Sequence, residues 1–258
     1  MSQTRVIAIA SQKGGVGKTT TAINLAACLA QNDQRTLLID LDPQANATSG
    51  LGLYQLRNTI YQVLLDTVPL SEAIHATAVE GLDLVPSDKN LAAIEIETVQ
   101  MEAKESLLKR AIQTVKASYT FVVIDCPPSL GLATLNGLTA AESVLVPVQA
   151  EFFALTGFGY LLNALAMIKR QLNPDLRIEG ALLTMVDTRA TLNQQVVAQM
   201  RSMFREKVFA TVVPRSVRLA EAAGYGKPIT IYDPTGRGAA AYLQLAQEVL
   251  RGSDTAQG

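Results

Sequence analysis

The 258-residue sequence predicts a single α/β domain whose mostly parallel, twisted sheet is covered by helices on both faces. The first observation is a series of short runs that are apolar throughout, as parallel strands buried on both faces are. The second is that segments with apolar residues at helical spacing lie between most of these runs. The third is that no internal repeat and no linker rich in Pro, Gly or Ser divides the chain. We therefore expect one domain over residues 1–251 and a short polar tail at 252–258.

The predicted elements alternate along the chain. The apolar runs that predict strands are Val6–Ala10, Thr36–Asp40, Leu82–Pro86, Phe121–Asp125, Ser143–Val148, Gly180–Val186 and Thr211–Pro214. The segments that predict the main helices are Thr21–Gln31, Glu102–Ala117, Leu155–Leu172, Leu192–Phe204 and Gly238–Leu250. In a sheet of this kind, ligands bind at the carboxyl ends of the strands. Polar residues that directly follow an apolar run are therefore the candidates for a functional site.

The composition is that of an ordinary soluble protein, with 48% hydrophobic and 17% charged residues and a formal net charge of −1. Near-neutral charge excludes a surface that is basic throughout, so nucleic-acid binding would need a local patch. Cys28 and Cys126 lie in or beside apolar segments without metal or redox spacing, which indicates buried thiols in a reducing compartment. The polar amino terminus and the lack of an apolar run of about 18 residues predict a cytoplasmic protein that has no membrane partner.

A glycine-rich turn follows the first apolar run and precedes the first helical segment. Strand, glycine-rich turn and helix is the arrangement that places backbone N–H groups around a phosphate. The second lysine of the turn can reach the outer phosphates, and the hydroxyl that follows it can ligate Mg²⁺. A usual P-loop has glycine where this chain has Gln12, and it lacks the additional lysine found here at position 13. The predicted nucleotide-binding residues are Lys13, Gly14, Gly15, Val16, Gly17, Lys18, Thr19 and Thr20.

Three aspartates follow two other predicted strands. Asp125 ends the run Phe121–Asp125 and has the form of a Walker B carboxylate, which holds Mg²⁺ or one of its waters. The plainer interpretation is an aspartate that caps the next turn. Asp40 and Asp42 alternate and would face the same side of an extended segment, where one carboxylate could support the metal and the other could orient water. The residues alone do not divide these two roles.

The basic part of the chain lies between Arg189 and Arg251, with nine Lys or Arg residues against four acidic ones. Most of these charges are typical of solvated helix faces. Arg189 and Arg218 are stronger candidates, because each follows a predicted strand and could present a guanidinium to a phosphate backbone. The single histidine, His75, follows a short helical segment far from these motifs and is assigned no role.

Several of these motifs resemble one protein family along nearly the whole chain, from about Val6 to Leu250. The string Ser-Gln-Lys-Gly-Gly-Val-Gly-Lys-Thr-Thr-Thr-Ala-Ile-Asn-Leu-Ala is similar to the deviant Walker A box of the ParA/Soj/MinD ATPases. Leu-Ile-Asp-Leu-Asp-Pro-Gln and Val-Ile-Asp-Cys-Pro-Pro-Ser-Leu-Gly resemble its next two boxes. Downstream, Leu-Leu-Thr-Met-Val-Asp and Val-Pro-Arg-Ser-Val-Arg-Leu-Ala-Glu-Ala extend the likeness, which is greatest for the partitioning branch.

The resemblance implies a deviant P-loop ATPase that uses ATP and Mg²⁺ and forms a homodimer on ATP binding. Lys13 matches the signature lysine that reaches the partner's nucleotide, as an arginine finger does. Lys18 would bind phosphate in its own subunit, and Asp42 would position the hydrolytic water. Lys13, Lys18 and Asp42 are thus the implied catalytic residues.

The resemblance also implies ligands for the metal, the base and DNA. Thr19, Asp40 and Asp125 would support Mg²⁺, while Pro214 and Ser216 would contact adenine. Arg189 and Arg218 match positions that bind non-specific DNA in the Soj-like branch. This sequence has Ser216 where the family commonly has Asn, Ala45 where it has Gly, and Ala190 where it frequently has Thr.

The function implied is a slow ATPase whose ATP-bound dimer binds DNA non-specifically on the nucleoid and is released when a ParB-type partner stimulates hydrolysis. Alternatives are a MinD-like membrane-cycling ATPase, a ParA-like positioner of another cargo, a reductase like the nitrogenase iron protein, and a scaffold without turnover. The carboxyl end has few cations for a lipid-binding helix, neither cysteine is free to hold a cluster, and the Asp40–Asp42 pair favours turnover.

Overall fold

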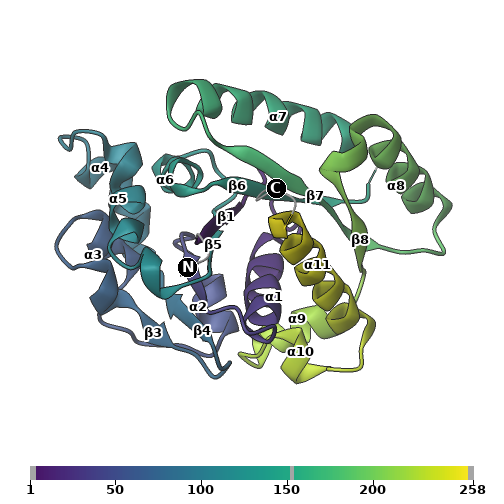
Figure 1. Cartoon of the computed structure of the whole chain (residues 1–258), viewed down its shortest axis with the longest axis horizontal. Helices are drawn as coiled ribbons and strands as arrows, with labels where there is room; N and C mark the ends of the chain where they lie inside the picture. Colours follow the sequence, from purple (N-terminus) through teal and green to yellow (C-terminus); the bar gives the residue numbers. More distant parts are fainter. Residues whose placement is uncertain (1–3, 152–153, 255–258) are drawn as a thin grey trace.

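The computed structural model describes residues 4–151 and 154–254, in which eight strands form one sheet (Figure 1). Residues 252–254 of the expected tail belong to the last helix, Arg237–Asp254, so the predicted boundary at 251 falls within this helix; the rest of the tail lies outside the described residues. Across the sheet, the strands are β3 His75–Ala76, β4 Leu82–Val85, β2 Thr36–Asp40, β5 Phe121–Asp125, β1 Arg5–Ile9, β6 Ser143–Gln149, β7 Arg177–Val186 and β8 Val208–Pro214. All neighbouring strands are parallel except β3 and β4. The predicted α/β fold is confirmed.

Most of the strands are separated along the chain by one or more α-helices. They are α1 Lys18–Ala30, α2 Asn46–Gly50, α3 Ile60–Leu64, α4 Ile94–Glu97, α5 Leu107–Gln113, α6 Leu132–Ala140, α7 Ala154–Gln171, α8 Thr191–Phe204, α9 Val217–Gly224, α10 Ile229–Tyr232 and α11 Arg237–Asp254. No helix in the described part of the chain combines the length and the apolar character needed to cross a lipid bilayer.

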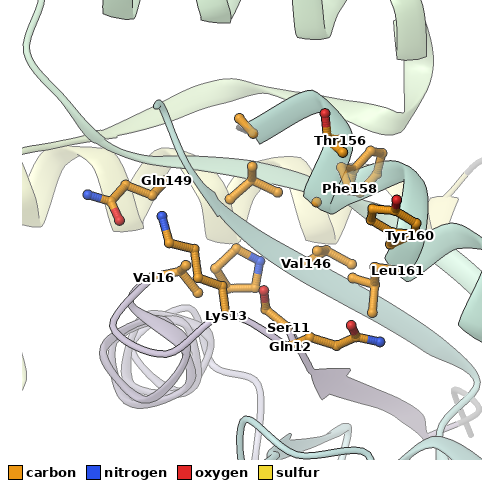
Figure 2. A pocket seen from close by; sticks show the side chains of 14 residues that line it. Ser11, Gln12, Lys13, Val16, Val146, Gln149, Thr156, Phe158, Tyr160 and Leu161 are labelled. Atoms are coloured by element: carbon orange, nitrogen blue, oxygen red, sulfur yellow. The ribbon is translucent and has the colours of Figure 1, made fainter. Parts of the chain in front are cut away.

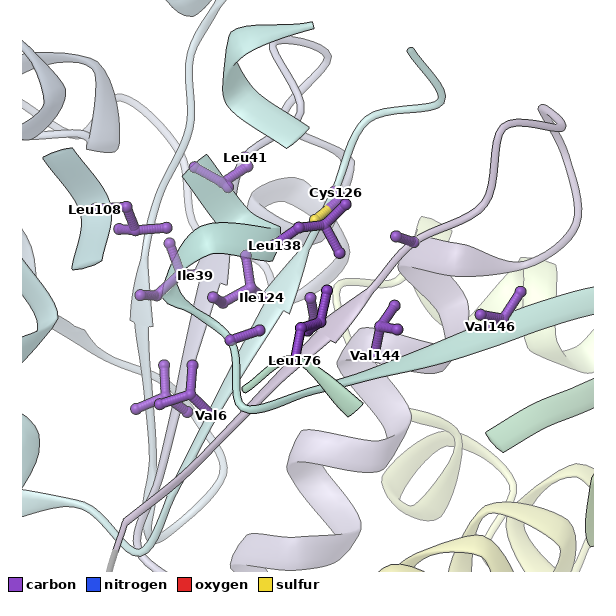
Figure 3. Packing of buried hydrophobic residues seen from close by; sticks show 14 of the residues in the cluster. Val6, Ile39, Leu41, Leu108, Ile124, Cys126, Leu138, Val144, Val146 and Leu176 are labelled. Carbon is purple, nitrogen blue, oxygen red and sulfur yellow. The ribbon is translucent and has the colours of Figure 1, made fainter. Parts of the chain in front are cut away.

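The central strands are apolar throughout because both of their faces are covered. In β1, Ile7 and Ile9 belong to the core shared with α1 and α11, whereas Val6 and Ala8 belong to the core shared with α5, α6 and α7. This alternation follows the two-residue period of a strand. Figure 3 shows members of the second core, including Leu108 from α5 and Leu138 from α6 beside residues of the sheet. Helices therefore lie on both faces and leave the strand ends open for a site.

One predicted helix is interrupted. The segment 102–117 contains α5 flanked by two 3₁₀ turns, Lys104–Ser106 and Lys116–Ser118. Asn136 of α6 supplies the reason, because its side chain accepts a hydrogen bond from the Leu108 N–H and donates one to the Lys104 carbonyl. These tertiary bonds replace the local bonds of a continuous helix. Two other helices differ from the prediction. Helix α1 begins at Lys18 and not at the predicted Thr21, and α6 is a buried helix that the sequence did not predict.

Two glycines meet where α9 packs near α2. Gly226 has a φ of +65°, and a Cβ atom there would lie 2.7 Å from the Gly52 Cα atom and 2.9 Å from the Gly52 nitrogen. Both contacts are to backbone, so the clash could not be relieved by a side-chain rotation.

We expect Gly226→Ala to lower the free energy of unfolding by roughly 2 kcal/mol or more, because it combines backbone strain with this clash. Gly224→Ala is the matched control, since a Cβ at that position would have no atom of the described chain within 4 Å apart from its sequence neighbours and the backbone of its own helix. Urea titration of both variants checks the prediction. If both variants unfold at the same urea concentration, the close contact between Gly52 and Gly226 does not restrict the residue at position 226.

Candidate functional site

The loop between β1 and α1 has the shape of an anion-binding turn. Gly15 and Gly17 have φ values of +71° and +89°, in the region that favours glycine. Within the described residues, no side chain caps the first turn of α1, and that turn holds no acidic residue. Its N–H groups and the positive end of the helix dipole are therefore directed to a ligand.

One buried contact fixes this loop to the sheet. The Thr184 hydroxyl of β7 donates a 2.8 Å hydrogen bond to the Val16 carbonyl, and Val16 is only 1% exposed. Gln12, Lys13, Gly14 and Gly15 on the other side of the loop are exposed. The loop is thus anchored at Val16 and open where a phosphate would bind.

Lys18 extends from the first turn of α1 into a buried position. Its Nζ atom donates a 3.2 Å hydrogen bond to the Lys13 carbonyl, and the residue is 7% exposed. Desolvation lowers the pKa of Lys18, while the carboxylates of Asp125 and Asp42 oppose that effect. A negatively charged phosphate beside Lys18 would stabilise the charged form of its side chain, as expected of a nucleotide-binding lysine.

Asp125 ends β5 beside this lysine and is fully buried. Among the described residues, neither carboxylate oxygen has a hydrogen-bond partner within normal geometry. Burial raises the pKa of Asp125 well above its usual range, the Asp40 charge adds to the rise, and the nearby Thr19 hydroxyl opposes it. A buried carboxylate without partners is costly unless a cation compensates it, so this residue fits a metal role.

Asp40 and Asp42 lie in different surroundings. Asp40 Oδ1 accepts the Asp42 N–H at 3.1 Å, and its Oδ2 accepts both the N–H and the hydroxyl of Thr48, at 2.9 and 2.8 Å. Burial raises the pKa of Asp40 to about 6 despite these bonds. Asp42 Oδ1 accepts a bond from the Gln44 N–H, and its Oδ2 accepts none from the part of the chain that the structure describes. The geometry therefore engages both oxygens of Asp40 and leaves one oxygen of Asp42 available.

The residues at this site fit a Mg²⁺ ion that binds together with the nucleotide. In residues 4–151 and 154–254, no three His, Cys, Asp or Glu side chains come together as a metal site. An ion here would rely on oxygen atoms of the nucleotide and water together with Thr19 and Asp125, which suits the preference of Mg²⁺ for oxygen. Asp40 as a metal ligand stays a prediction, and its satisfied oxygens favour Asp125 for that role.

A cavity of about 320 Å³ continues from the loop toward β7 and β8. Pro214 and Ser216 line it, as predicted for residues beside the base, together with Gly17 and Thr20 of the loop. Other lining residues escaped prediction, among them Met185, whose φ of +54° marks an irregular strand end, and the buried Tyr242 of α11. Only the position of Met185 at the end of an apolar run pointed to it; Tyr242 gave no signal.

The side chain of Lys13 forms an ion pair outside the phosphate loop. Its Nζ atom forms a 2.6 Å ion pair with Oε2 of Glu151, and the two side chains are 55% and 48% exposed. Figure 2 shows Lys13 beside Val16 and Gln149 at a mainly apolar cavity of about 460 Å³. The lysine therefore projects from the loop toward solvent and is bound by an exposed ion pair, which contributes little stability.

The two predicted DNA-binding arginines lie at neighbouring strand ends. Arg189 follows β7, is 89% exposed and pairs with Asp187, while Arg218 in α9 is 61% exposed and pairs with Glu221. The hydrogen bond from the Arg215 N–H to the Val186 carbonyl joins the ends of β7 and β8, which precede the two arginines. Their exposure permits phosphate contact, although each charge is partly offset by its own carboxylate.

Comparison with known proteins agrees with this geometry. A family model described as an AAA domain matches residues 4–178. The Bacillus subtilis (strain 168) sporulation initiation inhibitor protein Soj is 52% identical over 95% of this chain and 98% of its own length. The Myxococcus xanthus (strain DK1622) chromosome partitioning protein ParA is 49% identical over 96% of this chain and 88% of its own length.

A solved structure provides a third comparison. A Mycobacterium smegmatis structure described as cobyrinic acid a,c-diamide synthase with bound ADP and magnesium has a TM-score of 0.87 and 37% identity, and covers 98% of this chain and 97% of that chain. The predicted resemblance, ATPase activity and use of ATP and Mg²⁺ are confirmed at this level. The chain belongs to the Soj/ParA family of P-loop ATPases.

Proposed function

We propose that this ATPase positions DNA by an ATP-gated cycle. Two subunits bind ATP and dimerise, the dimer binds DNA non-specifically on the nucleoid, and a ParB-type partner stimulates hydrolysis and releases it. The observation that carries this proposal is Lys13, a second lysine of the phosphate loop that is half exposed and projects to solvent. A lysine placed in this way can complete the nucleotide site of a second subunit, and the names of the curated relatives support a role in partitioning.

The residues of each subunit have distinct roles in this cycle. The loop N–H groups and Lys18 bind the phosphates, and Asp42 orients the attacking water with its available oxygen. Thr19 and Asp125 would hold Mg²⁺, which supplies positive charge against the phosphate oxygens when bound. Lys13 of the partner subunit adds a further cation at the same phosphates, so hydrolysis and dimerisation become linked.

We assign DNA binding to the two segments that follow β7 and β8 and carry Arg189 and Arg218, called the basic loops below. We expect Arg218→Glu to weaken non-specific DNA binding about tenfold or more. The slope of the logarithm of DNA affinity against the logarithm of salt concentration should fall by about one for each phosphate that the protein no longer neutralises. ATP-dependent dimerisation should persist, because Arg218 lies outside the phosphate loop. Fluorescence anisotropy with duplex DNA over a salt series, in the presence of ATP, measures both quantities.

Arg170→Glu is the matched control for charge reversal. Arg170 lies in the last turn of α7, shortly before β7 begins, whereas the basic loops follow the carboxyl ends of β7 and β8. The substitution should leave DNA affinity and its salt dependence near those of the parent protein. Equal losses in the two variants would show a general effect of net charge, and no loss in Arg218→Glu would place the DNA surface elsewhere.

A further inference from the structure

A threonine outside the phosphate loop connects the Asp40–Asp42 segment to the rest of the sheet. Thr48 lies in α2, directly after this segment, and is 6% exposed. Its hydroxyl donates to Asp40 Oδ2 at 2.8 Å and accepts the Ser87 N–H at 3.0 Å. Ser87 follows β4, so this single hydroxyl joins the segments after two neighbouring strands.

The same network determines the path of the backbone at Asp42. Thr48 holds one oxygen of Asp40 through both its N–H and its hydroxyl, and this fixes the orientation of the carboxylate. The other oxygen, Oδ1, accepts the Asp42 N–H at 3.1 Å. The order of contacts is therefore Ser87, Thr48, Asp40 and Asp42, and every link is a hydrogen bond between groups that are buried.

We propose that Thr48 is a positioning residue for ATP hydrolysis, which acts through Asp40 to hold Asp42 where it orients the attacking water. This inference rests on the proposed role of Asp42 in hydrolysis. The side chain of Thr48 bonds to Asp40 and Ser87, and Thr48 does not line the cavity beside the base. It therefore affects the reaction through the placement of Asp42 and leaves nucleotide binding to the loop.

A purely structural role would have a different signature. If Thr48 only anchored α2 to the segment after β4, its loss would lower stability and leave turnover by the folded protein unchanged. Positioning residues act on the chemical step, where a displacement of about 1 Å can cost on the order of a hundredfold in rate. The ratio between kcat and KM effects separates the two roles.

The test replaces the hydroxyl with groups of similar size. We expect Thr48→Val, which keeps the backbone N–H bond but removes the hydroxyl, to lower kcat about tenfold or more with KM for ATP within about twofold of the parent. ATP-dependent dimerisation should remain, since the loop and Lys13 are intact. Thr48→Ser, which restores the hydroxyl, should recover most of the turnover.

Thr139→Val is the matched control. The Thr139 hydroxyl is buried in α6 without a hydrogen-bond partner among the described residues, and Thr139 does not belong to the network of Ser87, Thr48, Asp40 and Asp42. Removal of this hydroxyl should leave kcat near the parent value. If Thr48→Val does not fold, Thr48→Ala is measured in its place with the same expectation.

Two outcomes would overturn the inference. One is a folded hydroxyl-free variant with parental kcat; the other is a KM increase that matches the loss of turnover. Asp42→Ala, measured in parallel, separates failure of this inference from failure of the proposed function. If Asp42→Ala is inactive while Thr48→Val is fully active, the role of Thr48 alone is refuted; if Asp42→Ala turns over normally, the assignment of Asp42 is refuted as well.

Discussion

Lys13→Ala should abolish ATP-dependent dimerisation and, with it, DNA binding, while the isolated subunit still binds ATP. Lys18 and the N–H groups of the loop remain in this variant, so the subunit keeps its own phosphate contacts. What it lacks is the exposed ammonium that pairs with Glu151 in the single subunit and would reach the second nucleotide in the dimer. Light scattering during gel filtration with and without ATP measures the mass, and a fluorescent ATP analogue measures binding.

Lys169→Ala is the control for removing a lysine charge. Lys169 lies in the last turn of α7, away from the loop. The Lys169→Ala variant should therefore still have the mass of a dimer in the presence of ATP. A dimer of normal stability in Lys13→Ala would contradict the shared site. Loss of ATP binding by the monomeric variant would instead place Lys13 in its own subunit's site.

Asp42→Ala should trap the ATP-bound dimer on DNA. Hydrolysis is expected to fall roughly 10²–10⁴-fold, the range for loss of a group that moves or orients a proton. Binding should persist because, among the described residues, the one hydrogen bond that the Asp42 side chain accepts comes from the Gln44 N–H, outside the phosphate loop. Phosphate release and DNA anisotropy, followed after addition of ATP, measure the two properties.

Asp42→Asn separates the charge of Asp42 from its structural bond. The asparagine keeps an oxygen for the Gln44 N–H but lacks a carboxylate, so it should be as inactive as the alanine variant. Restored turnover in Asp42→Asn would assign Asp42 a structural role and leave hydrolysis to another residue.

Much of the fold could be predicted because its central strands are apolar on both faces. Residues Thr36–Asp40 and Phe121–Asp125 form β2 and β5 with the predicted bounds. The phosphate loop could also be predicted from the sequence, since it requires glycine at positive φ just before a helix begins. Where local patterning and tertiary packing agree, sequence is sufficient.

The remaining features depend on contacts between distant segments. The interruption of 102–117 requires Asn136, and the two-residue strand β3 is too short to show a period. The Lys13–Glu151 pair joins residues 138 positions apart, and no local pattern announces it. Asp40 and Asp42 looked equivalent in sequence because only the fold brings Thr48 to one of them. Their difference in surroundings is thus a tertiary property.

The most direct test of the shared site mixes two inactive variants. In a dimer of one Lys13→Ala and one Asp42→Ala subunit, the nucleotide site of the first subunit keeps its own Asp42 and receives Lys13 from the second. If Lys13 acts across the interface, mixing the variants before ATP is added should produce ATP turnover well above the sum of the two measured alone. Turnover equal to that sum would show that Lys13 serves its own subunit, and would contradict the ATP-gated dimer.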